Sequence, residues 1–195
     1  MGASPVTGTS VHLDVRERFL AFNEPFEGRC PFMYLDVKGL VTTGVGNLID
    51  PVVAALALPW KRPDGTPATL NEVQDEWIAV KTRTDLAPRG GGHFEAITVL
   101  RLTDEDIDRL VMRKLDEMAA HIQHAHPCFA SLPSDVQLAV LSMAWAMGPA
   151  FPFPRFWAHI EAGDYKAAAE ECTINPPIGT IVKRNAANRS LLLAA

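Results

Sequence analysis

The amino-acid sequence predicts an α+β protein that is mostly α-helical, with one small β-hairpin in its N-terminal third. Several segments repeat apolar residues at helical spacing, and two of them follow a Ser or Thr that has an acid or amide three residues later. Only one segment, residues 40–45, shows the alternating, β-branched pattern of a strand after a turn signal. The 195 residues, 48% of them hydrophobic, suit one domain, or two small lobes that share a helix, with a substantial core.

The first helix is expected to begin at Ser10, which is placed to act as its N-cap. Apolar residues follow at positions 11, 15, 19 and 22, close to helical spacing, after a small polar tail over residues 1–9. Pro25 has no backbone N–H to donate, so we expect the helix to stop or to be distorted near it.

A β-hairpin is predicted directly after this helix. Residues 32–35 form a short apolar run, and residues 36–39, Asp-Val-Lys-Gly, are typical of a turn. Residues 40–45 then alternate in the manner of a returning strand.

The middle of the chain, residues 59–92, is its least regular part and is rich in Pro and Gly. Within it, residues 70–82 favour one helix that carries Trp77. The stretch Pro-Arg-Gly-Gly-Gly-His-Phe over residues 88–94 predicts a loop.

Two capping boxes are expected to begin long helices in the C-terminal half. Thr103 and Asp106 precede the helical pattern that runs to about residue 126. Ser134 and Gln137 begin a helix that is apolar almost all round, which is typical of a helix buried in the centre of a fold. This helix is expected to end at Gly148, which is followed by proline.

Three more helical segments are predicted toward the C-terminus. They cover residues 153–162, a short turn over residues 165–171 that Asp164 caps, and an amphipathic helix over residues 181–195.

Composition and charge exclude several classes of partner. The net charge of −5 argues against nucleic acid, which demands a basic surface, and gives no attraction to anionic wall polymers. No run of about 18 apolar residues predicts membrane insertion, and the N-terminus lacks the features of a secretory signal. Three cysteines without Cys-x-x-Cys spacing predict neither a disulfide framework nor a cysteine zinc site, so we expect folding in a reducing compartment.

Glu27, Asp36 and Thr42 surround the predicted hairpin and are the candidate catalytic residues. Glu27 is flanked by apolar Phe26, and burial against apolar surface raises the pKa of a carboxyl group. A turn at residues 37–39 would bring Asp36 near Thr42, where the two side chains could hold and polarise a water molecule. A protonated Glu opposite an ionised Asp is the acid/base pair of an inverting glycosidase.

Glycines follow these residues, and they complete a motif that is found in a known family. Glu27-Gly28 followed by Tyr34-x-Asp36-x-x-Gly39-x-x-Thr42-x-Gly44-x-Gly46 resembles the active-site signature of the phage-type lysozymes, glycoside hydrolase family twenty-four. The helical segments of the C-terminal half are similar to the helices of that family, so the resemblance covers most of residues 10–195.

The resemblance implies a lysozyme-like fold for residues 1–195 as a single domain. Residues 10–102 would form the first helix, the small hairpin lobe and an insertion from about residue 48, and residues 103–195 would form a larger helical lobe. We expect the first helix to pack on the larger lobe. Where the family commonly has His this chain has Asn47, and Ala146 replaces a polar residue of the central helix.

The same resemblance implies cleavage of the β-1,4 bond between N-acetylmuramic acid and N-acetylglucosamine in bacterial peptidoglycan. Glu27 would be the general acid, and Asp36 and Thr42 would activate water, with no cofactor and no metal. The predicted substrate-binding residues are Tyr34, Gly44, Gly46 and Asn47. We expect a monomer that is made in the bacterial cytoplasm without a signal peptide and acts on the cell wall after release or delivery, with any immunity or delivery partner unidentified.

Two other functions remain open on the sequence. A lytic transglycosylase would use a single acid and give anhydro products, although it has no need of Asp36 and Thr42 to position water. A catalytically weak wall-binding module would keep the scaffold, and Asn47 and Ala146 leave this reading open.

Several other side chains have both a functional and a structural interpretation. The cluster His121, His124, His126 and Cys128 has the residue types of a zinc site, but a solvated helix C-terminus is the favoured interpretation. Trp60 and Trp77 either stack on sugars or pack in the interior. Two arginines of the last helix either contact wall peptides or lie on a solvated face, and the solvated face is favoured; they are Arg184 and Arg189.

Overall fold

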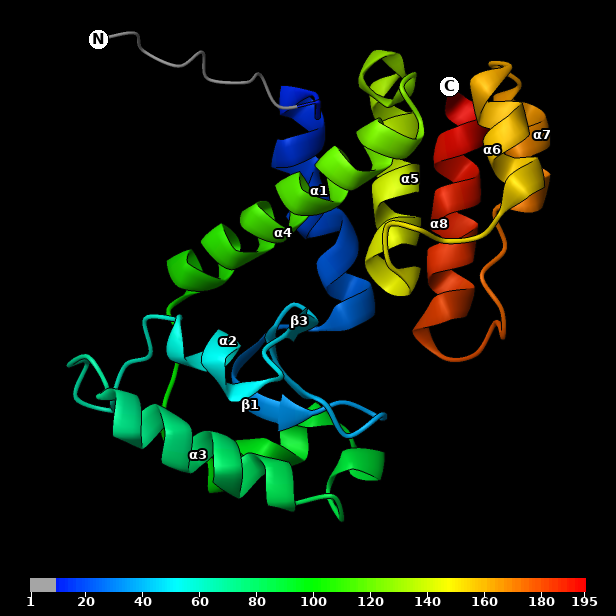
Figure 1. The fold of residues 1–195 in the computed structure, drawn as a ribbon. Helices are drawn as coiled ribbons and strands as arrows, with labels where there is room; N and C mark the ends of the chain where they lie inside the picture. The colour runs from blue at the N-terminus through cyan, green and yellow to red at the C-terminus, as the bar shows by residue number, and fades with distance from the viewer. Residues whose placement is uncertain (1–9) are drawn as a thin grey trace, which may run out of the picture. The chain divides into compact units, whose positions relative to one another are not determined.

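The computed structural model describes residues 10–195, and it confirms a mostly helical α+β protein with one small antiparallel sheet (Figure 1). The chain divides into two compact units. One unit spans Glu27–Met112 and contains the sheet, and the other is formed by the chain up to Phe26 and from Arg113 onward. Each unit is described below by itself.

The sheet of the first unit has three strands in the order β1-β2-β3, namely Cys30–Leu35, Val41–Gly44 and Asn47–Leu48. The predicted hairpin is confirmed, because β1 and β2 pair antiparallel across the turn at residues 36–40. The two-residue strand β3 was not predicted, since so short a segment carries no alternation that the sequence could reveal.

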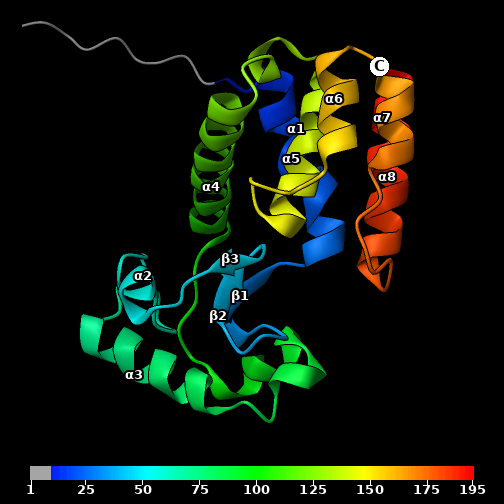
Figure 2. The same ribbon diagram turned by 45° about the vertical axis from the view of Figure 1, so that its right-hand side comes forward.

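Two helices and two 3₁₀ segments accompany the sheet in this unit. Helix α2 spans Val52–Leu56 and lies beside α3, Leu70–Thr82, which also packs against β1 and β2 (Figure 2). The predicted helix over residues 70–82 is confirmed, and Thr69 and Glu72 form a capping box at its start. The predicted loop at residues 88–94 is corrected, because 3₁₀ turns occupy Ala87–Arg89 and Gly91–Ile97.

Helix α4, Asp104–Ala125, begins in the first unit and continues in the second. Its predicted capping box is confirmed: the backbone N–H of Asp106 donates to the Thr103 hydroxyl at 3.1 Å, and the backbone N–H of Thr103 donates to the Asp106 carboxylate at 3.4 Å. The guanidinium of Arg29, just before β1, pairs with Asp104 and Asp108 at 3.1 and 2.6 Å. This pairing ties the start of α4 to the sheet.

Helix α1 spans Leu13–Glu27, so it ends two residues after Pro25, close to the expected stop. Pro25 is exposed and lies in the last turn, where its missing N–H removes a single hydrogen bond, and the helix continues for two residues. Val15 and Phe19 are fully buried as their spacing predicted. The helix begins three residues after Ser10, which is therefore not its N-cap.

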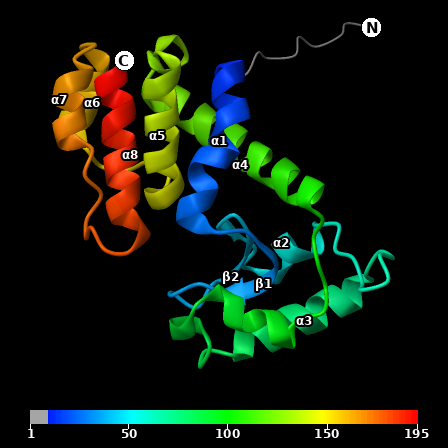
Figure 3. The same ribbon diagram turned by 180° about the vertical axis from the view of Figure 1, so that it is seen from behind.

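The second unit is built around α5, Ser134–Met147, which lies between α1 and α8 (Figure 3). Ten of its residues are buried, which confirms the prediction of a central helix. Around it lie α6, Pro154–Glu161, α7, Tyr165–Glu171, and α8, Thr180–Ala194, and Asp164 caps α7 as expected. The first helix packs here, with the Phe19 and Trp145 rings 5.2 Å apart.

The expected capping box at Ser134 and Gln137 is wrong, because a long-range contact uses both side chains. The Gln137 side chain accepts a hydrogen bond from the His12 N–H at 3.0 Å and donates to the carbonyls of Ser10 and Phe129 at 3.0 and 2.8 Å. The Ser134 hydroxyl donates to Asp14 at 2.8 Å. These bonds hold the start of α1 against the start of α5.

The two C-terminal arginines differ in their surroundings. Arg184 is only 1% exposed and donates hydrogen bonds to Asn23 and to the carbonyl of Ser142 at 2.8 and 2.9 Å, so a solvated face is wrong for it. Arg189 lies on the exposed side of α8 and pairs with Glu170 at 2.5 Å.

Within residues 10–195, no three His, Cys, Asp or Glu side chains converge in a way that would bind a metal ion. His121 and His124 are exposed, whereas His126 stacks on Trp157 with ring centres 3.6 Å apart and lies 2.8 Å from the Glu161 carboxylate. Among the helices of the same residues, none has the length and apolar character that crossing a bilayer requires.

Candidate functional site

The register of the hairpin places three of the motif residues on one face of the sheet. Tyr34 of β1 lies directly opposite Thr42 of β2, so their side chains point to the same side. Asp36 is two residues beyond Tyr34, and its N–H donates to the Leu40 carbonyl at 3.0 Å, which continues the same register. Asp36 is therefore a diagonal neighbour of Thr42, at a spacing of roughly 7 Å between such pairs.

Asp36 closes the turn with one oxygen of its carboxylate. Its Oδ1 atom accepts the N–H groups of Lys38 and Leu40 at 2.8 and 2.9 Å, and its carbonyl accepts the N–H of Gly39. The Oδ2 atom has no hydrogen bond to any of residues 10–195, and the side chain is half-buried. The turn thus orients the carboxylate and leaves Oδ2 to accept a bond from water or a ligand.

The Thr42 hydroxyl has one fixed partner. It donates to the Leu40 carbonyl at 3.2 Å, and the residue is only 5% exposed. Because a hydroxyl has one proton and two lone pairs, this bond leaves Thr42 Oγ1 able to accept a hydrogen bond. A water molecule that donates to Oγ1 would have its orientation set by the hairpin backbone.

The charges of the two acidic motif residues, Glu27 and Asp36, both act on the Tyr34 side chain. Burial raises the pKa of the Tyr34 phenol well above its usual range, and the charges of Cys30, Glu27 and Asp36 raise it further. Glu27, the last residue of α1, and Asp36 therefore both lie within electrostatic reach of one ring. The hairpin therefore brings Tyr34, Asp36 and Thr42 together, and Glu27 lies within electrostatic reach of Tyr34.

The Tyr34 ring packs on a glycine that the sequence analysis assigned to a loop. A Cβ atom built on Gly91 would lie 2.9 Å from the Cδ2 atom of Tyr34, which is closer than real Cβ atoms approach. The second 3₁₀ segment also packs against β1. Gly91 therefore lets the 3₁₀ segment approach the Tyr34 ring closely, a contact between residues far apart in the sequence that no local pattern indicates.

Gly44, Gly46 and Asn47 shape the turn between β2 and β3. The two glycines have φ angles of 62° and 69°, which disfavour other residues. Asn47 is 2% exposed, and its side-chain oxygen accepts the Val45 N–H at 3.1 Å. These contacts give a structural reason for all three residues, and their role in binding substrate remains a prediction.

A contact from α3 to the hairpin was missed by the sequence analysis. The ammonium group of Lys81 donates to the Gly39 carbonyl at 2.7 Å and pairs with Asp50. Asp50 in turn accepts the Val41 N–H at 3.2 Å. Lys81 is 42 residues from Gly39 along the chain, so no local pattern could have indicated this pairing.

The charge state of Asp50 reflects this contact. Burial alone raises the pKa of Asp50, but the hydrogen bonds from Lys81 and Val41 outweigh burial, so the pKa is lowered. We call Lys81 and Asp50 the α3 brace, because together they fix both the turn and the start of β2.

The two tryptophans of the middle region pack in the interior. Trp60 is 1% exposed and its indole N–H donates to the Ala55 carbonyl at 2.9 Å. Trp77 is half-buried, donates to the Ile49 carbonyl at 3.0 Å and lies beneath the Lys81 ammonium. Packing is therefore the interpretation that the structure supports for both.

Comparison with known proteins adds no family assignment to this geometry. No family model matches the chain, and no curated protein sequence matches it. The resemblance to phage-type lysozymes therefore remains a prediction from the motif residues.

Proposed function

We propose that the protein has a lysozyme-like fold and hydrolyses the β-1,4 bond between N-acetylmuramic acid and N-acetylglucosamine in peptidoglycan. The observation that carries the proposal is the hairpin register, in which Asp36 and Thr42 are diagonal neighbours on one face. The electrostatic effect of Glu27 and Asp36 on Tyr34 supports the same site. Without this grouping, a Glu at a helix end and an Asp in a turn would be ordinary structural residues.

Each of the three residues has a role in this proposal. Glu27 acts as the general acid and protonates the oxygen of the leaving sugar. The Asp36 Oδ2 atom acts as general base and takes one proton of the attacking water, while Thr42 Oγ1 accepts a hydrogen bond from the other O–H of that water. Tyr34 forms a wall of the site, and the turn of Gly44, Gly46 and Asn47 holds the end of β2.

The reaction is expected to invert the anomeric carbon. An inverting glycosidase holds a water between acid and base, with the two carboxyl groups roughly 6.5–9.5 Å apart, whereas a retaining enzyme holds them about 5–5.5 Å apart. Asp36 with a hydroxyl beside it suits the binding of water. Proton NMR of the first product formed should therefore show the α-anomer of the new reducing end.

Such an enzyme requires no metal or cofactor, because a carboxylic acid and a carboxylate supply the acid and base. Its partner would be bacterial peptidoglycan, which it would reach after release or delivery from the cytoplasm, acting as a monomer.

The test is mass spectrometry of the soluble products from purified peptidoglycan. Muropeptides with a free reducing N-acetylmuramic acid end are expected from the wild type and should be lost in Glu27→Gln. The matched control is Glu17→Gln, which removes an exposed carboxylate from the same helix and should leave the products unchanged.

Other results would identify one of the two alternative functions instead. Anhydro ends, lighter by one water, would identify a lytic transglycosylase and make Asp36 and Thr42 substrate-positioning residues. If neither protein released products yet both sedimented with peptidoglycan, the chain would be a wall-binding module.

A further inference from the structure

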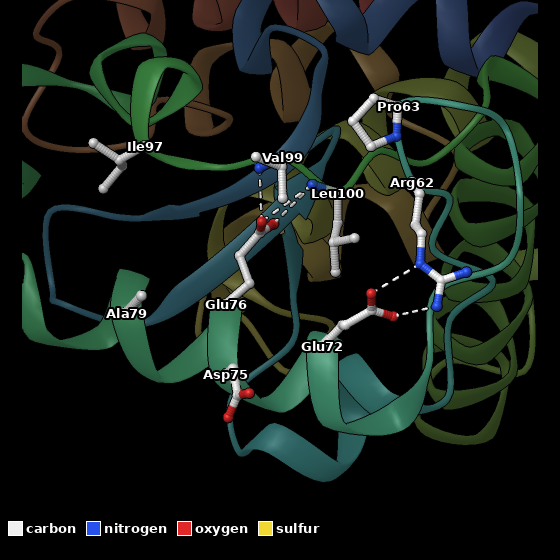
Figure 4. A pocket seen from close by; sticks show the side chains of 9 residues that line it. All are labelled: Arg62, Pro63, Glu72, Asp75, Glu76, Ala79, Ile97, Val99 and Leu100. Atoms are coloured by element: carbon white, nitrogen blue, oxygen red, sulfur yellow. Dashed lines mark hydrogen bonds and ion pairs between the residues drawn. The ribbon is translucent and has the colours of Figure 1, made fainter.

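A pocket separate from the hairpin motif lies in the same unit, between α3 and the extended segment that follows the second 3₁₀ turn (Figure 4). Its volume is about 510 Å³, within the range of roughly 300–1,000 Å³ that is typical of small-molecule sites. None of its lining residues belongs to the predicted catalytic or substrate-binding set.

The walls of the pocket are mainly apolar. Pro63, Ala79, Ile97, Val99 and Leu100 contribute to them. Val99 is 61% exposed and Ile97 is 36% exposed, so apolar surface at the pocket remains accessible to solvent. A ligand with an aliphatic part would remove this surface from water, which is favourable.

One buried carboxylate, that of Glu76, faces this apolar surface. Glu76 is 8% exposed, and Figure 4 shows its side chain directed at the backbone of the extended segment. Its Oε2 atom accepts the N–H groups of Val99 and Leu100 at 2.7 and 3.1 Å, while Oε1 makes one longer contact of 3.3 Å to Leu100. A carboxylate offers about four acceptor positions, so Oε1 retains capacity for a donor.

Glu76 forms no ion pair with another of residues 10–195, and the charge of Arg101 acts on its carboxylate only from a greater distance, where it opposes the effect of burial on the pKa. Within residues 10–195, no Lys, Arg or His nitrogen lies within 4.0 Å of its carboxylate. The cation of the pocket, Arg62, is engaged by Glu72 through two bonds of 2.8 and 2.7 Å. Asp75 adds an exposed carboxylate at the edge, so with these groups ionised the pocket has a net negative charge.

We propose that this pocket binds a primary ammonium group on an alkyl chain, the chemistry of a lysine side chain. The apolar walls cover the alkyl chain, and the ammonium group donates to Glu76 Oε1. Burial raises the pKa of Glu76, and a bound cation would counter that effect by stabilising the ionised form. The site is distinct from the hairpin motif and does not depend on the proposed hydrolase activity.

The test is an NMR titration of the full chain with two matched compounds. The first is Nα-acetyl-lysine N-methylamide, and the second is the norleucine analogue, which keeps an aliphatic chain but lacks the ammonium group. The amide signals of Val99 and Leu100 report the site directly, because both groups donate to Glu76. We expect saturable shifts with the lysine compound and at least tenfold weaker affinity for the norleucine compound, since the latter cannot donate a hydrogen bond to the carboxylate.

A third arm identifies the source of the ammonium group. Pentylamine carries the same group without peptide bonds, so equal affinity would show that a free amine suffices. Weaker binding of pentylamine than of the lysine compound would assign the site to a peptide side chain. Both results require the ammonium group and support the pocket.

Single-residue variants test whether the lysine compound binds in this pocket. Glu76→Gln should weaken the lysine compound at least tenfold, because it removes the charge but keeps an oxygen acceptor for the backbone. Val99→Lys, at an exposed position, should block the site by supplying a resident ammonium group, and it covers the case in which Glu76→Gln fails to fold. The matched control is Glu105→Gln, which removes an exposed carboxylate of α4 and should leave binding unchanged.

Three results would overturn the proposal. They are equal affinity for the lysine and norleucine compounds, the same loss in Glu105→Gln as in the pocket variants, or no saturation up to roughly 10 mM of the lysine compound.

Discussion

At the scale of single residues, the turn that carries Asp36 is held from two sides. Asp36 itself closes the turn from within, through bonds to the N–H groups of Lys38 and Leu40. Lys81 holds the Gly39 carbonyl from α3, and Asp50 holds the N–H of Val41. The direction of the Asp36 carboxylate therefore depends on the α3 brace as well as on the turn.

Replacing Lys81 with Met is expected to impair catalysis by changing the position of the Asp36 carboxylate. The variant keeps the side-chain length but removes the donor to Gly39 and leaves Asp50 without its cation. Under the proposed function we expect kcat to fall about tenfold with KM little changed, because a small displacement of a catalytic group lowers the rate of the chemical step strongly. The measurement is the rate of muropeptide release at several peptidoglycan concentrations.

The control for this experiment is Lys38→Met, which removes an exposed lysine from the same turn and should leave kcat unchanged. A loss confined to KM, or an equal loss in both variants, would contradict a positioning role for Lys81.

At the scale of elements, α3 combines a standard helix start with two long-range attachments. Its capping box of Thr69 and Glu72 is local in sequence, whereas the brace and the contact from Glu76 to residues 99–100 are not. Glu72 also pairs with Arg62. The bonds from Arg62 and from the Thr69 N–H and hydroxyl lower the pKa of Glu72 to about 2.

Because of this lowered pKa, the contribution of Glu72 to the free energy of unfolding depends on pH. A carboxylate that is stabilised in the folded state favours folding fully above its ordinary pKa of 4.5, and the contribution is lost as pH falls toward about 2. Glu72→Gln should therefore lower the free energy of unfolding at pH 7, and the gap to wild type should close between about pH 4.5 and pH 2.

Urea unfolding at a series of pH values measures this gap. The matched control is Asp75→Asn, which removes an exposed carboxylate from the same helix and has no ion pair within residues 10–195. A gap for Glu72→Gln that persists unchanged at pH 2 would show that the capping contacts act without the charge.

At the scale of the whole molecule, the chain leaves the helical unit at Phe26 and returns to it at Arg113. That unit is therefore closed by contacts between distant segments. The edge-to-face pair of Phe19 and Trp145 and the bond from Arg184 to Asn23 join α1 to α5 and α8. Helix α5 lies at the centre of these contacts, so its packing should dominate the stability of the unit.

Leu141→Ala tests this expectation. Leu141 is fully buried in α5, and Leu-to-Ala changes at buried sites typically destabilise by about 2–5 kcal/mol, so we expect a loss of about 3 kcal/mol. Guanidinium unfolding followed by far-ultraviolet circular dichroism measures it.

The same change at Leu193, which is 42% exposed on α8, should cost less than about 0.5 kcal/mol. Equal losses at both positions would contradict the central role of α5.

The candidate site was predictable in its residues but only partly in its surroundings. The hairpin and its register follow from period-two alternation and a turn signal, which are local, so Asp36 and Thr42 could be placed together from sequence. The brace by Lys81 could not, because it joins residues 42 apart. The packing of Tyr34 on Gly91 was hidden for the same reason.

The sequence by itself determined the fold class, the hairpin, the helices at residues 70–82 and 104–125, and the burial of α5, because each depends on the spacing of neighbouring side chains. Only the tertiary structure decided that Gln137 joins two helices instead of capping one, and that Arg184 is buried. In each case a partner far along the chain outweighed the local preference. Such contacts form only once the chain has folded.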